Sequence, residues 1–123
     1  MTVIPSAAAP TFDVPGVRFT GLAAPSRGAS ENSVWLIAIE PGAPGTPHSV
    51  TREEIFVATH GRAELQLDGT TQVLAPGDAA VVPAHTRFSL ANPHDEPFHA
   101  VVVLPVGGQA VTDEGEFTPP WAA

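Results

Sequence analysis

Cysteine is absent from this sequence of 123 residues. Disulfides and thiolate metal sites are therefore excluded, and a bound metal would need imidazole and carboxylate ligands. Basic residues are also scarce: all five are arginines, and together with thirteen acidic residues they give a formal net charge of −8. Such a chain repels phosphate backbones and anionic lipid, so neither nucleic acid nor a membrane surface is an expected partner.

Long apolar segments are missing as well. The longest runs, such as residues 100–104, are far too short to span a bilayer. The N-terminus carries no basic segment, and Pro5 and Pro10 interrupt its apolar residues, so a signal peptide is not expected. The length is that of a single domain with one hydrophobic core. These features predict a cytoplasmic protein.

Helical periodicity is absent too, because fourteen prolines and eleven glycines recur too often for a long helix. What remains is a series of about nine short strand-like runs separated by turn signals, of which Asp68-Gly69 is the strongest. This pattern predicts an all-β fold, an antiparallel double-sheet jelly-roll barrel. We expect an N-terminal arm and outer strand over residues 1–32, a barrel core over 33–105 and a C-terminal tail over 106–123, in one domain overall.

The two ends of the chain show less regularity than the middle. Residues 1–16 have no periodicity and are expected to form a loose arm, whereas residues 17–22 are suited to an outer strand. In the irregular tail, Phe117 and Trp121 are expected to pack on the outside of the sheet or on a partner subunit. Both tryptophans are expected to serve packing rather than ligand binding.

The first chemistry-bearing stretch runs from Gly42 to Gly61. Five residues separate Gly42 from His48, Val50 follows two positions later, and three further residues lead to Glu54. Six residues then separate Glu54 from Gly61. Glu54 begins a run in which alternate residues share one face, as in a strand.

The second stretch runs from Gly77 to Asn92. Five residues after Gly77 comes Pro83-Ala84-His85, then two residues, Phe88, three more residues and Asn92. In order and spacing the two stretches resemble the paired motifs of the cupin superfamily, the small jelly-roll barrels. Over residues 33–105 the chain is similar to a small single-domain cupin. The resemblance implies the same barrel fold.

The resemblance also implies where a metal would bind. In cupins the two histidines of the first motif, its glutamate and the histidine of the second motif hold a divalent ion. At the matching positions this chain has His48 and Glu54, but Val50 and Phe88 replace the other two ligands. Iron, manganese, nickel or zinc would therefore have two ligands from the motifs, with His85 or His99 as possible additions. Tight sites usually have three or four protein ligands, so no cofactor is expected to be tightly held.

Three functions from different classes stay open. The first is a metal-independent isomerase or cyclase, in which His48 and Glu54 form an acid–base pair in a largely apolar cavity lined by Val50, Phe56 and Phe88, with His85 at its mouth. The second is a non-catalytic barrel that binds or senses a small molecule. The third is a metal-dependent oxygenase or isomerase with an altered ligand set.

A structural alternative also exists for His48: it is a buried barrel histidine hydrogen-bonded to Glu54 and has no function. Burial raises the pKa of a glutamate and lowers that of a histidine, while their pairing opposes both shifts. A small molecule is the expected partner in each functional case. Because cupins often pair through sheet edges and terminal arms, the resemblance also implies a homodimer.

Overall fold

The structure is a computed structural model that describes residues 2–123, so the first residue of the expected N-terminal arm lies outside it. Within this range the chain forms short strands and three 3-10 helices of three residues each. These helices are η1 (Ser6–Ala8), η2 (Pro25–Arg27) and η3 (Pro120–Ala122). The strands are β1 (Thr11–Val14), β2 (Val17–Ala23), β3 (Asn32–Ile39), β4 (Ser49–Val50), β5 (Glu54–His60), β6 (Ala63–Leu67), β7 (Thr70–Leu74), β8 (Ala79–Val82), β9 (Phe88–Ala91), β10 (Phe98–Pro105), β11 (Ala110–Thr112) and β12 (Gly115–Phe117). Residues 2–123 contain no helix with the length and hydropathy needed to cross a membrane.

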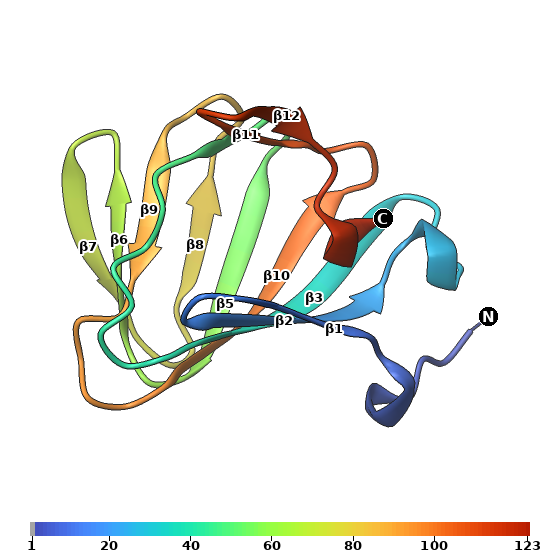
Figure 1. Ribbon diagram of the computed structural model, residues 1–123, viewed down its shortest axis with the longest axis horizontal. Helices are drawn as coiled ribbons and strands as arrows, with labels where there is room; N and C mark the ends of the chain where they lie inside the picture. The colour runs from blue at the N-terminus through green and yellow to red at the C-terminus, as the bar shows by residue number, and fades with distance from the viewer. Residues whose placement is uncertain (1) are drawn as a thin grey trace.

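The strands form two antiparallel layers (Figure 1). One layer is a six-stranded sheet in the order β1-β2-β3-β10-β5-β8. The other contains two three-stranded sheets, β7-β6-β9 and β12-β11-β4. An isolated bridge between His48 and Phe88 joins these two smaller sheets, because Phe88 begins β9 and His48 directly precedes β4. This is the jelly-roll architecture that the sequence predicts.

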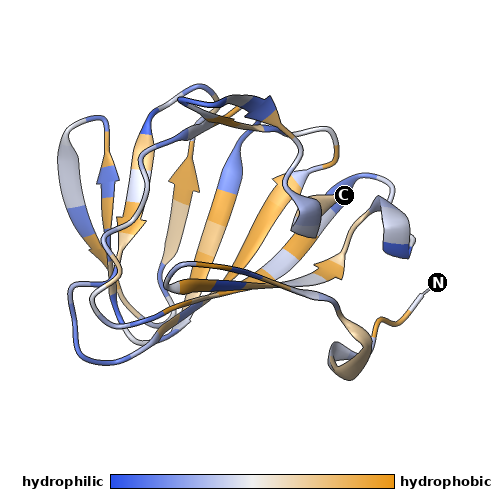
Figure 2. Cartoon of the chain, in the orientation of Figure 1, coloured by the Kyte–Doolittle hydropathy of each residue, from blue (hydrophilic) through white to orange (hydrophobic). Residues whose placement is uncertain are grey.

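The hydrophobic core lies between the two layers. Alternate residues of β3, β5 and β10 point inward from the six-stranded sheet, and residues of β4, β6, β7 and β9 meet them from the other layer. Figure 2 shows the same division, with hydrophobic residues along the strands and largely hydrophilic loops. The inward-facing set is Trp35, Ile37, Ile39, Val50, Phe56, Ala58, Ala63, Leu65, Leu74, Val82, Phe88, Leu90, Phe98, Ala100, Val102 and Leu104.

The predicted strands of the middle region are confirmed, and so is the hairpin turn predicted at Asp68-Gly69. Both residues have positive φ, 49° and 81°, which is the backbone of a two-residue hairpin loop of type I′. The expectation of a loose arm over residues 1–16 was wrong in part, because Thr11–Val14 pairs with Val17–Thr20 as β1. The shortest strands, β4, β11 and β12, carry too few residues to show periodicity in the sequence.

The C-terminal tail packs against the inner side of the barrel sheet, not its outside as expected. The Trp121 ring stacks on Phe19, with ring centroids 3.6 Å apart, and meets Trp35 edge-on at 6.5 Å. The buried Ser33 hydroxyl donates a hydrogen bond of 2.7 Å to the Ala122 carbonyl. Phe117, by contrast, is 43% exposed. The tail therefore completes the core beside β2 and β3.

Trp121→Ala is expected to destabilise the fold by about 3 kcal/mol, because the variant loses a large aromatic contact and leaves Trp35 poorly covered. Urea unfolding measures the change. The matched control is Phe117→Ala, which removes an exposed ring from the same tail and is expected to change stability by less than about 0.5 kcal/mol. A loss of stability in Trp121→Ala as small as that in Phe117→Ala would show that the tail does not belong to the core.

Candidate functional site

His48 is held at the junction of the two smaller sheets. Its backbone N–H donates to the Phe88 carbonyl at 2.9 Å, and the Phe88 N–H donates to the His48 carbonyl at 2.8 Å. The ring is half-buried, and its Nδ1 lies 2.8 Å from the Thr46 carbonyl oxygen. Because a carbonyl only accepts, Nδ1 carries the proton in the neutral ring and Nε2 has a free lone pair. The local fold thus sets His48 up as a base through Nε2.

The charge state of His48 favours the same role. Burial lowers the pKa of the imidazole, the Thr46 hydrogen bond partly opposes this shift, and the nearby Arg87 guanidinium lowers the pKa further. A neutral ring therefore predominates at neutral pH. The Thr46 contact could not be predicted from the sequence, because a backbone carbonyl acceptor is present at every residue.

Glu54 is the first residue of β5 and is only 4% exposed. It pairs in register with Val82, which is fully buried, and its inward neighbour on β5 is Phe56. Burial raises the pKa of the Glu54 carboxyl to about 8. The carboxyl is therefore mostly protonated at neutral pH and can donate a proton or a hydrogen bond.

The expected hydrogen bond between His48 and Glu54 is not formed. Across residues 2–123 the ion pair that the structure contains joins Arg18 to Asp13, and no ring nitrogen of His48 lies within 4.0 Å of a Glu54 carboxylate oxygen. Burial acts on both groups, whereas neither shifts the pKa of the other. The structural alternative, in which His48 is the hydrogen-bonded partner of Glu54, is therefore not supported.

Phe88 fills the space beside His48. Its ring centroid lies 4.4 Å from that of His48 and 6.0 Å from that of Phe56. Phe88, Val50 and Phe56 are 2%, 2% and 5% exposed and belong to the core. The sequence predicted that these three side chains line a cavity, but the structure packs them into the interior.

Two hollows are formed elsewhere on the molecule. One, of about 640 Å³, lies against β6, β7 and β8, and the other, of about 480 Å³, lies among the turns that follow β5, β7 and β9. Neither is lined by His48 or Glu54. Neither of these hollows therefore opens onto the two candidate residues.

The histidines considered as additional metal ligands lie apart from this site. His85 is exposed in a turn with a φ of 62°, and its backbone N–H donates to the Val50 carbonyl at 2.7 Å. His99 is exposed on the outer face of β10, since its neighbours Phe98 and Ala100 point inward. The extra-ligand hypothesis is therefore not supported for either residue.

The residues present do not fit the metal that the resemblance implies. His48 and Glu54 are the two donors left at the motif positions, and hydrophobic side chains occupy the others. In the described part of the chain no group of three or more histidine or acidic side chains is arranged to hold an ion. Two of the four motif positions therefore carry a side chain that can bind a metal.

The motif residues that are kept serve the fold. Asn92 is fully buried, and its side-chain amide donates to the Ile39 and Glu96 carbonyls while its oxygen accepts from the His94 N–H. Gly61 has a φ of 69°, and a Cβ there would clash with the Pro97 carbonyl oxygen. The motifs thus retain their structural positions and lack half of their metal ligands.

Comparison with known proteins agrees with this architecture. A family model described as a Cupin domain matches residues 35–104. The structure of KdgF from Halomonas sp. superposes with a TM-score of 0.72 and 24% identity, covering 85% of this chain and 94% of that one. The polyketide cyclase RemF from Streptomyces resistomycificus gives a TM-score of 0.77 with 19% identity, covering 85% and 79%. An RmlC-like cupin from Shewanella frigidimarina gives 0.74 with 19% identity, covering 85% and 90%. No curated protein matches the chain.

Proposed function

Because the chain belongs to the cupin family, we propose that its barrel binds a small molecule at His48 and Glu54 and transfers a proton on it without a metal. The observation that carries this proposal is the buried Glu54 carboxyl, whose pKa burial raises to about 8. A protonated acid and a neutral imidazole on the same interior are the two halves of an acid–base pair.

The roles follow from the protonation states. His48 Nε2 takes a proton from a carbon next to a carbonyl group, because Nδ1 is already occupied by its bond to Thr46. Glu54 donates to the carbonyl oxygen as negative charge develops there. No ring nitrogen of His48 lies within 4.0 Å of a Glu54 carboxylate oxygen, so the two groups do not neutralise each other directly. The reaction class is enolisation or double-bond isomerisation of a largely apolar carbonyl compound.

The polyketide cyclase RemF shares this fold, and cyclisation is a reaction of the same acid–base kind. At 19% identity the likeness extends to the fold alone. The metal-dependent alternative has less support, because its ligand set would have to be assembled from two donors.

The test uses a panel of neutral cyclic ketones and β,γ-unsaturated ketones in deuterium oxide, followed by proton NMR. The wild-type chain is expected to speed exchange of the protons next to the carbonyl. Glu54→Gln or His48→Gln should slow this exchange by about a hundredfold or more. Activity should also fall above a pH of about 8, where Glu54 loses its proton. The matched control is Glu53→Gln, which changes the exposed neighbour of Glu54.

A second candidate is a barrel that binds a small molecule without catalysis, because the family match supports the fold and not a particular reaction. It predicts that panel compounds shift the NMR signals of His48 and Phe88 while exchange stays at the rate of the Glu54→Gln variant. If no compound shifts these signals and none exchanges faster than in that variant, both candidates fail.

A further inference from the structure

Two histidines face each other on the outer surface of the six-stranded sheet. His99 of β10 and His60 of β5 are paired across the strands, and both are exposed. Their ring centroids lie 5.5 Å apart, with the rings nearly perpendicular at 80°. Neither residue takes part in the barrel site.

A β-bulge creates this pair. Glu54, Phe56 and Ala58 point inward, so regular alternation would aim His60 inward as well. The register between β5 and β10 shifts where Ala58 pairs with Ala100 and His60 pairs with His99, which leaves Thr59 as an extra residue. Such a bulge re-aims the side chain that follows it. His60 is thereby turned outward, onto the face that carries His99.

We propose that His60 and His99 form a surface site for a divalent transition metal that prefers imidazole ligands, with copper(II) bound most tightly and nickel and zinc more weakly. Two imidazoles on one ion, with metal–nitrogen distances of about 2.0–2.1 Å, place their ring centres roughly 5 Å apart. The spacing of 5.5 Å is close to this value. A modest rotation of the two rings therefore suffices to chelate an ion.

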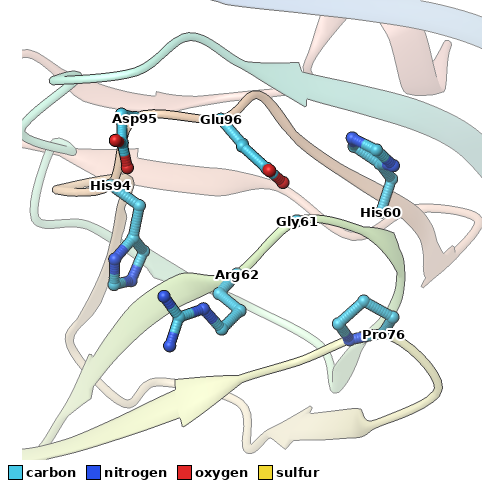
Figure 3. Close-up of a pocket in the computed structure, with 7 residues that line it drawn as sticks. All are labelled: His60, Gly61, Arg62, Pro76, His94, Asp95 and Glu96. Atoms are coloured by element: carbon cyan, nitrogen blue, oxygen red, sulfur yellow. The ribbon is translucent and has the colours of Figure 1, made fainter.

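The surroundings of the pair suit a cation. His60 borders the hollow of about 480 Å³, which is also lined by Arg62, His94, Asp95 and Glu96. In Figure 3 the Glu96 carboxylate points toward the His60 side of this hollow, while Arg62 extends toward His94. The net charge of −8 adds a favourable field. Because residues 2–123 hold no preformed cluster of three ligands, the two imidazoles are the fixed donors and water or Glu96 completes the sphere.

This site is independent of the proposed function. It places any bound transition metal on the outside of the barrel, on the opposite side of the sheet from Glu54. Metal found in the purified protein would therefore not by itself indicate a metal centre in the barrel. Substitution of His99 separates the two cases, because His99 is exposed and does not contact the barrel core.

The experiment is a titration of the full chain with copper(II) near neutral pH, followed by calorimetry and electron paramagnetic resonance. We expect one equivalent that binds more tightly than any further equivalents, with two imidazole nitrogens on the metal. His99→Ala and His60→Ala should each weaken binding by about a hundredfold, because the second ligand no longer acts at high effective concentration. The matched control, His85→Ala, removes an exposed histidine that is not paired and should leave the affinity unchanged.

Equal affinity in the wild-type chain and the His99→Ala variant would overturn the proposal, as would a loss in His85→Ala equal to that in the pair variants. Thermal unfolding without metal verifies that all variants fold. His60→Ala and His99→Ala act through different strands, so agreement between them assigns the loss to the pair and not to a local disturbance.

Discussion

Replacing Glu54 with glutamine will flatten the pH dependence of folding stability between about pH 5 and about pH 8. In the folded chain, burial raises the pKa of Glu54 from the ordinary value of 4.5 to about 8. The unfolded chain therefore releases this proton several pH units before the folded chain does.

The direction of the effect follows from proton binding. Below a pH of about 4.5 both the folded and the unfolded chain hold the proton, so Glu54 lowers the folding stability little. Between this pH and about 8 the folded state holds more protons than the unfolded state, and stability falls by about 1.4 kcal/mol per pH unit. Above about 8 the loss levels off. Glu54→Gln should thus match the wild type near pH 5 and exceed it by on the order of 3 kcal/mol near pH 8.

Urea unfolding across this pH range, with the two curves subtracted, isolates Glu54 because all other titrating groups cancel. Glu53→Gln is the matched control, since it removes an exposed carboxylate one residue away. It should not reproduce the gain in stability that Glu54→Gln shows near pH 8. Parallel curves for the wild type and Glu54→Gln would mean that the Glu54 carboxyl is ionised in the folded protein.

Val50→His combined with Phe88→His will produce a metal site inside the barrel. These substitutions restore imidazoles at the two motif positions that lack them, beside His48 and Glu54. Four donors satisfy nickel or zinc, whereas two do not. At a free metal concentration one hundred times the dissociation constant, binding should stabilise the fold by about 2.7 kcal/mol. Without metal the variant should be less stable than the wild type, because it buries polar rings in the core.

The double variant is best made in a His99→Ala background, which removes the proposed surface site. Thermal unfolding with and without nickel or zinc then reports on the barrel alone. Phe88→His by itself supplies three donors and should bind more weakly than the double variant. An equal metal-induced stabilisation in the His99→Ala parent would show that the barrel already holds a metal.

The fold could be predicted because its signals are local. Alternating hydrophobic residues predicted β3, β5, β6 and β10, and the Asp68-Gly69 pair predicted a hairpin. The motif spacing indicated the family. The short strands β11 and β12 were missed, because strands of three residues have no period. The position of Trp121 was predicted on the wrong side, since a tail without periodicity does not show which face it covers.

The site was predictable in its members but not in its arrangement. Spacing identified His48, Glu54, Val50 and Phe88, and the structure places all four in or beside the barrel interior. The sequence spacing could not show that Nδ1 of His48 bonds to a backbone carbonyl, or that Glu54 makes no hydrogen bond to this histidine. The pairing of His60 with His99 could not be predicted either, because the β-bulge that produces it has no recognisable sequence pattern here.

A metal ion and hydrophobic side chains at the motif positions would have opposite effects on the charge of Glu54. A metal ion would hold its carboxylate ionised, whereas hydrophobic neighbours keep it protonated. Val50 and Phe88 are hydrophobic and buried, so the barrel favours the protonated form.

The most direct measurement is the titration of Glu54 itself, followed by carbon NMR of its labelled Cδ with Glu54→Gln for assignment. We expect a midpoint at a pH of about 8, unchanged by added nickel or zinc in the His99→Ala background. A midpoint near the ordinary value of 4.5, or one that metal drives down from about 8, would contradict a metal-independent acid at the centre of this barrel.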